Sequence, residues 1–428
     1  MSATNLITIP LKYGSRRRNP CYIEFLQTSK SEYPDGKHMN MKGALYGLEA
    51  LIRKTVRPGR VFDYYYGQTS KPRGRVLLSY LQGPLRWKSS DKRFMGHSNT
   101  WECREIARIF NELGYAVDAI NYDDLTFQST RIYDAIFDIH NNLSRYDNGH
   151  AVKILHATGS NPTFSNRALA KRLDDLEKRR GVKLEPRRAI QEDSIRVFEA
   201  NLEVADIITI TGNERTKSTY PEKLHDKIRL VPVTGSYLPV VRSIPDFVPK
   251  KEFLWFGGSG AVHKGLDIVL EVFAKNPDLT LHIIGPYQNE KDFCRAYKRE
   301  LSHYGNMKAH GYVYPHSDQF RCITKHVIAL VFPSCSESTS SAGVTCMQYG
   351  MIPIVSIDTG ITLTQYQGIT LNSCTLDEVE QAVHTIANKT ELEIKGTIAE
   401  CQKYALDTFS RNRFSEMMKS VIREALYG

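Results

Sequence analysis

The residues with the clearest chemical potential follow two apolar segments in the second half of the chain. Residues 253–273 read FLWFGGSGAVHKGLDIVLEVF: an apolar run, a glycine-rich turn with Lys264 after it, and an amphipathic helix. Residues 331–355 read VFPSCSESTSSAGVTCMQYGMIPIV: an apolar run, a polar loop carrying Glu337, a short helix closed by Gly350, and a second apolar run. Two strand–loop–helix units with backbone amides at each helix start suit a phosphate and a sugar bound between them.

The glycine-rich turn of the first segment is a candidate diphosphate site. Glycine has no side chain to obstruct a ligand, so the ligand can approach the backbone closely. The ammonium of Lys264, added to the dipole at the helix start, would neutralise a diphosphate. The alternative is a plain strand–helix turn with a solvated lysine, because a glycine-rich turn alone is weak evidence. The candidate donor-binding residues here are Gly257, Gly258, Ser259, Gly260 and Lys264.

The polar loop of the second segment is a candidate sugar site. The carboxylate of Glu337 can accept hydrogen bonds from sugar hydroxyls. The serine and threonine residues around it could instead cap the following helix. Both roles are compatible if amides at the helix start meet a phosphate while a hydroxyl caps nearby. The candidate donor-binding residues here are Ser341, Ala342, Gly343, Val344 and Thr345.

The first half of the chain carries a polar loop and two histidines next to predicted elements. His140 and His156 each end a predicted strand, where a histidine is either close to a transferred sugar or a structural hydrogen bonder. A helix is predicted from residue 100, with Ser98 or Asn99 as its N-cap. The candidate residues of the loop before it are Gly96, His97, Ser98 and Asn99.

Strands and helices alternate from residue 75 onward. Such alternation predicts parallel sheets with helices on both faces, and ligands that bind beyond the carboxyl ends of the strands, where every candidate lies. Strands are predicted at 76–81, 116–122, 135–139, 153–155, 205–210, 228–233, 253–256, 279–284, 308–313, 328–332 and 352–356. Helices are predicted at 43–56, 100–113, 187–204, 265–275, 290–303, 317–325, 343–349 and 411–426.

This pattern divides the chain into five parts. Residues 1–73 are predicted to be an extension packed on the first domain, and residues 236–251, with three prolines at 235–251, a linker. Residues 74–235 and 252–410 are each predicted to form a Rossmann-like domain. Residues 411–428 are predicted to form a terminal helix that crosses back to the first domain.

Composition excludes several classes of protein. With 41% apolar and 24% charged residues among 428, the chain is predicted to be globular, with two domains. It has no RNP, KH or zinc-finger pattern, so no nucleic-acid partner is predicted in spite of its net charge of +10. Eight scattered cysteines without a CxxC pair, and no signal-peptide core or bilayer-spanning run, predict a cytoplasmic protein.

A cationic stretch at 178–188 allows two interpretations. It contains Lys178, Arg179, Arg180, Lys183, Arg187 and Arg188, with acidic residues between and before them. The mixture favours a solvated helix face. The alternative is a peripheral contact with an anionic membrane face, close to a lipid-linked acceptor.

The two segments resemble those of the retaining GT-B-fold glycosyltransferases, the large family that includes sucrose synthases and bacterial mannosyltransferases. Residues 253–273 are similar to the diphosphate segment of that family, and Pro333 to Pro353, through Glu337 and Gly350, to its paired-glutamate segment. Tyr312 and Val313, after Gly311, are similar to the turn near its nucleobase. The resemblance covers residues 205–360 by motif and 75–204 by pattern only.

The resemblance implies an α/β fold of two Rossmann-like domains facing each other across a cleft, with the acceptor on 74–235 and the nucleotide sugar on 252–410. It implies transfer of a sugar from a nucleotide-diphosphate sugar to a hydroxyl of a glycan, polysaccharide or lipid-linked acceptor, with retention of configuration. No acidic metal motif of the DxD kind stands at a predicted strand end, so no metal or other cofactor is predicted, and Lys264 and backbone amides are expected to stabilise the diphosphate. The resemblance also implies donor-binding roles for Tyr312 and Val313. The catalytic residues implied are Lys264, Glu337, His156 and His140.

Two positions depart from the family pattern. Ser259 stands where the family usually has an arginine, and Thr345 where it has a second glutamate, which commonly holds the ribose. The departures keep open a non-catalytic nucleotide-sugar-binding or scaffold protein. A nucleotide-sugar epimerase is a further alternative, although no convincing set of acid–base carboxylates stands around the expected sugar position.

Overall fold

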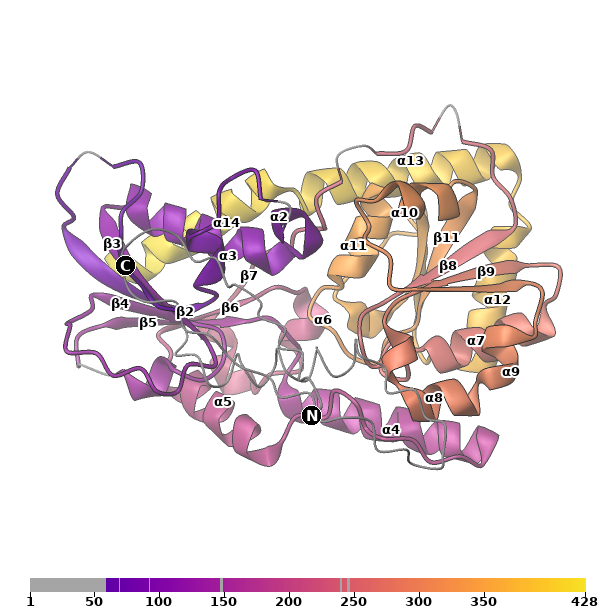
Figure 1. Ribbon diagram of the computed structural model, residues 1–428, viewed down its shortest axis with the longest axis horizontal. Coiled ribbons are helices and arrows are strands. Elements are labelled where there is room, and N and C mark those ends of the chain that lie inside the picture. Colours follow the sequence, from indigo (N-terminus) through magenta and orange to yellow (C-terminus); the bar gives the residue numbers. More distant parts are fainter. Residues whose placement is uncertain (1–58, 69, 92, 147–148, 239–240, 245–246) are drawn as a thin grey trace, which may run out of the picture. The chain divides into compact units, whose positions relative to one another are not determined.

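Two sheets organise the chain in a computed structural model, which describes residues 59–428 except 69, 92, 147–148, 239–240 and 245–246. The helix predicted at 43–56 and most of the predicted 1–73 extension lie outside the described residues. We call the part built on the first sheet the first lobe and the part built on the second sheet the second lobe (Figure 1). The prediction of parallel sheets is confirmed.

The sheet of the first lobe has the strand order β1-β3-β2-β4-β5-β6-β7. β1 pairs antiparallel with β3, and the other neighbours run parallel. β1 is absent from the predicted strands and comes from the described end of the extension. The strands are β1 (Val61–Tyr64), β2 (Gly74–Tyr80), β3 (Tyr115–Asn121), β4 (Ala135–Asp138), β5 (Val152–Ala157), β6 (Ile207–Ile210) and β7 (Ile228–Leu230).

The helices of the first lobe begin later or earlier than predicted in two places. The helix predicted at 187–204 begins at Glu192, because Arg188 has a left-handed backbone with φ 73°. The helix predicted from residue 100 begins at Ser98, with His97 as its N-cap. The helices are α2 (Arg93–Gly96), α3 (Ser98–Glu112), α4 (Pro162–Arg180), α5 (Glu192–Val204) and α6 (Glu214–Lys217), with short 3₁₀ turns at Gly83–Leu85, Leu143–Arg145 and Glu222–Lys227.

The sheet of the second lobe is parallel throughout its described strands, in the order β10-β9-β8-β11-β12-β13. Its strands are β8 (Glu252–Phe256), β9 (Thr280–Ile284), β10 (Met307–Gly311), β11 (Val327–Phe332), β12 (Ile352–Ser356) and β13 (Ile369–Leu371). Its helices are α7 (Leu266–Lys275), α8 (Lys291–Ala296), α9 (Lys298–Ser302), α10 (Asp318–Ile323), α11 (Ser341–Gln348), α12 (Leu376–Ala387) and α13 (Glu391–Thr408), with 3₁₀ turns at Tyr287–Asn289 and Ile357–Thr359.

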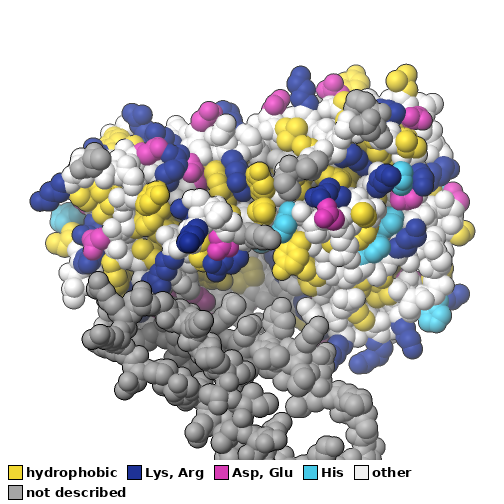
Figure 2. Space-filling view, turned by 45° about the horizontal axis from the view of Figure 1, so that its top comes forward, with side chains coloured by type: hydrophobic (Ala, Val, Ile, Leu, Met, Phe, Trp, Pro, Cys, Tyr) yellow, Lys and Arg dark blue, Asp and Glu magenta, His cyan; other side chains and the backbone are white. Residues whose placement is uncertain are grey.

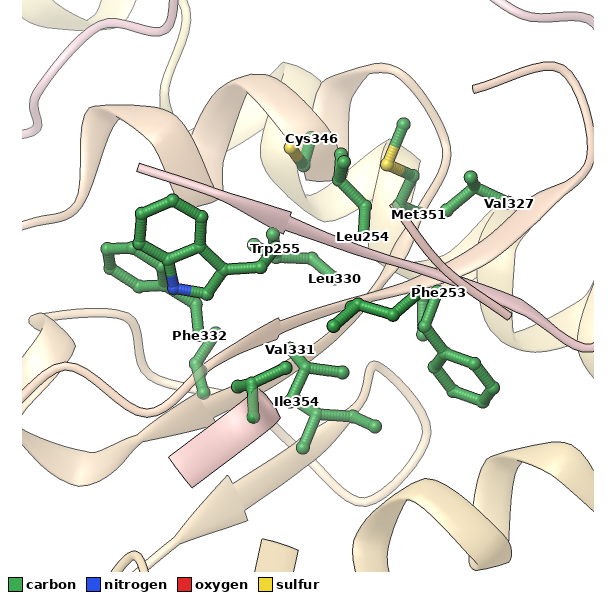
Figure 3. Close-up of a cluster of buried hydrophobic side chains, with 14 of the residues drawn as sticks. Phe253, Leu254, Trp255, Val327, Leu330, Val331, Phe332, Cys346, Met351 and Ile354 are labelled. Atoms are coloured by element: carbon green, nitrogen blue, oxygen red, sulfur yellow. The ribbon is translucent and has the colours of Figure 1, made fainter. Parts of the chain in front are cut away.

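The core of the second lobe fixes the ends of the two strands that carry the candidate site. Figure 3 shows the side chains of β8 and β11 packed with those of α11 and β12. Phe253, Leu254 and Trp255 are completely buried, and so are all six residues of β11 to within 1%. Central parallel strands are buried on both faces, which explains their continuous apolar runs. Burial of this kind holds Gly257 and Pro333, just beyond the strand ends, in fixed positions.

The terminal helix α14 (Arg411–Tyr427) belongs to the core of the first lobe, although it follows the second lobe in sequence. Phe414, Met418 and Ile422 are completely buried there. α14 lies beside α3, as Figure 1 shows in yellow and indigo. Burying three large apolar side chains contributes roughly 5 kcal/mol or more to holding this helix on the first lobe.

The cationic stretch at 178–188 makes contacts between the lobes. Arg179 of α4 donates to Asp267 at 2.9 Å and to Glu271 at 3.1 Å. Arg180 pairs with Glu300 at 2.6 Å, and Arg187 with Asp292 at 2.6 Å. Leu176 and Leu184, at the two sides of these arginines, are part of the core of the second lobe. Three arginines of this stretch therefore form ion pairs within the protein, although the sequence alone suggested contact with solvent or with lipid head groups.

On the face shown in Figure 2, the lysine and arginine side chains of the described residues are scattered over both lobes, with acidic side chains between them. Within the described residues, no helix is long and apolar enough to cross a bilayer.

Candidate active site

A cavity of about 420 Å³ lies between the carboxyl ends of the two sheets. We call it the first cavity. From the second lobe it is lined by Gly257, Gly258, Lys264, Tyr312, Glu337, Ser341 and Ala342, among others, and from the first lobe by His97, Ser98, Asn99 and His140. Most of the residues that the sequence singled out, from segments far apart in the chain, therefore meet at one place.

A second cavity of about 470 Å³ adjoins the first. Glu337 and His140 line both. The second cavity is rich in hydroxyl groups, and its wall includes the aromatic rings of Tyr122 and Phe198. The remaining hydroxyl-bearing residues lining it are Thr158, Ser160, Ser165, Ser194, Tyr220, Ser336 and Ser338.

Lys264 and Glu337 form an ion pair at the wall of the first cavity. Their side chains are only 10% and 13% exposed. Ser334 Oγ donates to the same carboxylate oxygen, Glu337 Oε1, at 2.8 Å. Burial alone would raise the pKa of the Glu337 carboxyl group, but the charge of Lys264 outweighs burial and lowers this pKa to about 2. Burial lowers the pKa of Lys264, and the charge of Glu337 opposes that change.

The pair is held by contacts between the two loops that carry it. Gly265 has φ 74°, and a Cβ there would lie 2.5 Å from the backbone oxygen of Pro333, so only glycine lets α7 start this close to the end of β11. His263 is buried, and its Nε2 lies 2.7 Å from the backbone oxygen of Ser336. Burial lowers the pKa of His263 to about 3, so the ring is neutral and donates this bond. His263 is thus a structural residue that braces the loop of Glu337.

Part of the glycine turn is occupied by an internal carboxylate. Glu290 is buried and accepts hydrogen bonds from the amides of Gly260 at 2.6 Å and Ala261 at 3.0 Å. The amide of Gly257 donates to the backbone of β9 at 3.1 Å. Ser259 is exposed and does not line the first cavity. Gly257 and Gly258 therefore border the first cavity, whereas the amide of Gly260 is not available to a ligand.

The start of α11 corrects three of the predicted donor-binding residues. Ser341 and Ala342 line the first cavity, but Gly343, Val344 and Thr345 do not. The amide of Gly343 donates to the capping hydroxyl of Ser340 at 3.1 Å, and that of Val344 to the Ser340 oxygen at 2.9 Å. Val344 and Thr345 are completely buried. The amide of Gly343 is thus occupied by the cap and that of Val344 by the first helical bond, whereas the amides at the first two positions of a helix have no helical partner.

The structure separates the two candidate histidines. His156 is completely buried, and its Nδ1 lies 2.7 Å from Thr209 Oγ1. Burial lowers the pKa of His156 to about 3, and the ring packs against Tyr80 and Phe137, so His156 is a core residue and not a wall of the cavity. His140 lines both cavities and packs edge-on against Tyr122. Burial lowers the pKa of His140, so its ring is neutral near pH 7.

Of the other predicted residues, some line the first cavity and others have structural positions. His97 Nδ1 accepts from the Asn99 amide at 3.3 Å and caps α3, so the predicted cap, Ser98 or Asn99, is wrong by one or two residues. Gly96 ends α2. Tyr312 is 53% exposed and lines the first cavity, whereas Val313 is buried in the core of the second lobe.

Glu102 is a carboxylic acid in the first cavity that the sequence did not single out. It is buried, and its Oε1 accepts from the amide and the hydroxyl of Thr234, both at 2.8 Å. Thr234 follows β7, where the chain leaves the first lobe. Burial raises the pKa of Glu102 to about 7, against the hydrogen bonds from Thr234 and the charge of Arg411. No motif marks Glu102, which reads as one more polar residue of an amphipathic helix.

Replacing Glu102 by glutamine is expected to stabilise the protein at pH 8 but not at pH 4. The folded-state pKa of Glu102 lies above that of the unfolded chain, so stability falls as pH rises from about 4.5 to 7, and the deficit is complete above pH 7. A glutamine oxygen accepts the same two hydrogen bonds without a charge. We expect a gain on the order of 2 kcal/mol in urea unfolding at pH 8. Glu199→Gln, at an exposed position on α5, is the matched control, and a loss of stability at pH 8 in Glu102→Gln would contradict the argument.

Among the described residues, no group of three or more His, Cys, Asp or Glu side chains is arranged to hold a metal ion.

Comparison with known proteins supports the arrangement of the second lobe. Residues 241–373 match the family model described as "Glycosyl transferases group 1". The matched region contains the glycine turn, Lys264, Tyr312 and Glu337. No significant match is found among curated proteins.

Three of the solved structures that match this chain illustrate the similarity in fold. Sucrose-phosphate synthase from Thermosynechococcus elongatus has a TM-score of 0.56 at 14% identity, over 83% of this chain and 99% of that one. HepE of Anabaena, solved with UDP-glucose, has a TM-score of 0.53 at 11% identity, over 82% of this chain and 100% of that one. A glycosyltransferase from Rickettsia africae has a TM-score of 0.53 at 11% identity, over 84% of this chain and 100% of that one. The predicted fold class is thus confirmed: this chain has the GT-B fold of the glycosyltransferases, and its second lobe contains a region that matches their group 1 family.

Proposed function

We propose that this protein transfers a sugar from a nucleotide-diphosphate sugar to a hydroxyl group of a glycan, polysaccharide or lipid-linked acceptor. The observation that carries the proposal is the meeting of Lys264, Glu337 and the glycine turn, all inside the matched region, at one cavity between the lobes. HepE, which shares the fold, was solved with UDP-glucose. The resemblance of residues 253–273 and 333–353 to the retaining enzymes is the basis for proposing retention of configuration.

Lys264 is proposed to stabilise the departing diphosphate. As the bond between sugar and diphosphate breaks, negative charge grows on the diphosphate, and a fixed ammonium in a site with little water stabilises that charge. The charge of Glu337 opposes the lowering of the Lys264 pKa by burial and so favours the ammonium form. We propose that this ammonium and the amides near Gly258 and Ser341 take the role that a metal ion has in other glycosyltransferases.

Glu337 is proposed to bind the donor sugar as well. Among the described residues, the hydrogen bonds to this carboxylate, from Lys264 and Ser334, both end on Oε1. Oε2 is therefore available to accept from sugar hydroxyls. Since Glu337 lines both cavities, the sugar would lie at their junction, which His140 also lines from the first lobe.

The second cavity is proposed to hold the acceptor. Its hydroxyl-rich wall matches the hydrogen-bonding groups of a sugar, and the aromatic rings of Tyr122 and Phe198 offer apolar surface for the face of a sugar ring. This placement brings an acceptor hydroxyl to the same junction that the donor sugar reaches from the first cavity.

A thermal-shift screen followed by a turnover assay tests the proposal. Nucleoside diphosphates and their sugars are expected to raise the melting temperature, because a ligand bound by the folded state stabilises it. Release of nucleoside diphosphate from the stabilising sugar nucleotide is then measured with and without simple glycoside acceptors. Stabilisation without turnover would favour a binding protein, conversion to an epimeric sugar nucleotide would favour an epimerase, and no stabilisation by any of them would overturn the proposal.

Glu337→Gln is expected to weaken binding of the sugar nucleotide by roughly tenfold and to leave binding of the free nucleoside diphosphate unchanged or tighter. The glutamine amide is a poorer acceptor for sugar hydroxyls than the carboxylate of Glu337. Because the negative charge of that carboxylate is lost, Lys264 is free to bind the diphosphate. Isothermal titration calorimetry with UDP-glucose and UDP, or the best pair from the screen, measures both. An equal loss for the two ligands would place Glu337 away from the sugar.

A further inference from the structure

The positive charge of Lys264 alone does not neutralise a diphosphate in the first cavity, so a further cationic residue is needed there. The charged side chains that line it are Glu102, Arg188, Lys264 and Glu337. Lys264 is neutralised by its ion pair with Glu337. Glu290 already occupies two amides of the glycine turn. Within the described residues, Arg188 is the cationic side chain of this cavity that makes no ion pair.

Arg188 belongs to the first lobe by sequence but lies against the second. It is in the connection between α4 and α5, and its side chain packs on the glycine turn: a Cβ at Gly260 would lie 2.5 Å from Arg188 Cδ. Its charge acts on both members of the ion pair. It lowers the pKa of Lys264 after the larger effects of burial and Glu337, and the pKa of Glu337 after those of burial, Lys264 and His263. Arg188 lines the second cavity too, so it stands at the junction where the donor sugar is proposed to bind.

The connection that carries Arg188 is fixed on both sides. On one side, Arg187 pairs with Asp292 of the second lobe, and Asp292 also accepts from the Glu185 amide at 3.0 Å. On the other side, the Asn166 side chain of α4 accepts from the Ile190 amide at 2.9 Å and donates to the Ile190 oxygen at 2.8 Å. Between these anchors Arg188 has a backbone φ of 73°, which is uncommon for a residue other than glycine. An unfavourable backbone conformation that its surroundings enforce is frequent at functional sites.

We propose that Arg188 binds the diphosphate of the donor across the glycine turn, adding positive charge to that of Lys264, which Glu337 partly offsets. The inference rests on the proposed function and adds a residue to it. A guanidinium is always charged and presents paired N–H groups that match two phosphate oxygens. Because the residue comes from the first lobe, donor binding would use both lobes at once.

Arg188→Gly is the decisive variant. Glycine favours the left-handed backbone, so this variant is expected to melt at or above the wild-type temperature while losing the guanidinium. Lys183→Ala, which removes a positive charge from an exposed position of the same connection, is the matched control. Arg188→Lys keeps the charge without the paired N–H groups.

The affinities of each variant for UDP and UMP are measured by calorimetry. If another nucleoside diphosphate and its monophosphate stabilise the wild type more, that pair is used instead. We expect Arg188→Gly to weaken the binding of UDP by roughly ten- to hundredfold and the binding of UMP much less. Arg188→Lys should have an intermediate affinity for UDP, and Lys183→Ala should bind both nucleotides as the wild type does. Wild-type affinity for UDP in Arg188→Gly, or an equal loss for UDP and UMP, would overturn the inference and leave the proposed function standing. A wild-type protein that binds no nucleoside diphosphate or sugar nucleotide would overturn both.

Discussion

Lys264→Ala is expected to lower kcat by roughly 100- to 1000-fold. The ammonium meets charge that is larger on the departing diphosphate than on the bound donor, so its loss raises the barrier more than it weakens substrate binding. Steady-state kinetics with the best donor and acceptor from the screen measure this. Lys275→Ala, at an exposed position at the end of α7, is the matched control and should turn over as the wild type does.

The same variant should also be less stable, because Glu337 loses its partner. Removing one member of a buried ion pair costs about 3 kcal/mol or more, since it leaves a carboxylate with few partners in a site with little water. The double variant Lys264→Ala, Glu337→Gln removes that carboxylate charge and should regain much of the stability without regaining activity. A folded Lys264→Ala enzyme with the kcat of the wild type would exclude Lys264 from the reaction.

Thr345→Glu is expected to destabilise the second lobe by roughly 4 kcal/mol or more. Thr345 is completely buried, donates to the Ser341 oxygen at 2.7 Å and accepts from the Ser236 amide at 2.9 Å. A glutamate would lose these two hydrogen bonds and leave the Ser236 amide without its acceptor. It would also bring a carboxylate into a tightly packed site. Urea unfolding of Thr345→Glu and of Thr345→Ser, which keeps the hydroxyl, measures the difference.

This result would separate Thr345 from the role of the family's second glutamate. By the sequence alignment alone, a glutamate at this position should meet the ribose and tighten nucleotide binding. In the structure the hydroxyl of Thr345 instead ties α11 to the chain that leaves the first lobe, at Ser236. A Thr345→Glu variant that melts as the wild type does and binds UDP more tightly would restore the alignment at this position.

Ser259, in the glycine turn, is the second position where the family alignment does not identify the residue's role. It stands where the family usually has an arginine, and its side chain is exposed and outside the first cavity. Arg188 reaches the turn from a different part of the chain. The sequence pattern around residue 259 is therefore a poor guide to whether a guanidinium is present at this turn.

The sequence by itself determined the features that depend on local order. The apolar runs of β8 and β11 predict buried strands, because parallel strands are covered on both faces. The residues that follow such strands lie at one edge of the sheet, so Lys264 and Glu337, 73 residues apart, were expected near the same ligand, and they form an ion pair. Lys264, Glu337 and the first residues of α11 could be found in this way, and so could the parallel α/β architecture, whereas the GT-B fold was inferred from the resemblance of the motifs.

The tertiary structure decided which polar residues face the cavity. His140 and His156 both end parallel strands, and no local pattern says that one lines the cavity and the other packs on Tyr80 and Phe137. Glu290, Glu102 and Arg188 reach their places through contacts with residues 29 to 132 positions away or with another lobe. Such contacts depend on the path of the whole chain and on how the lobes pack, whereas periodicity and spacing report only on neighbours in sequence.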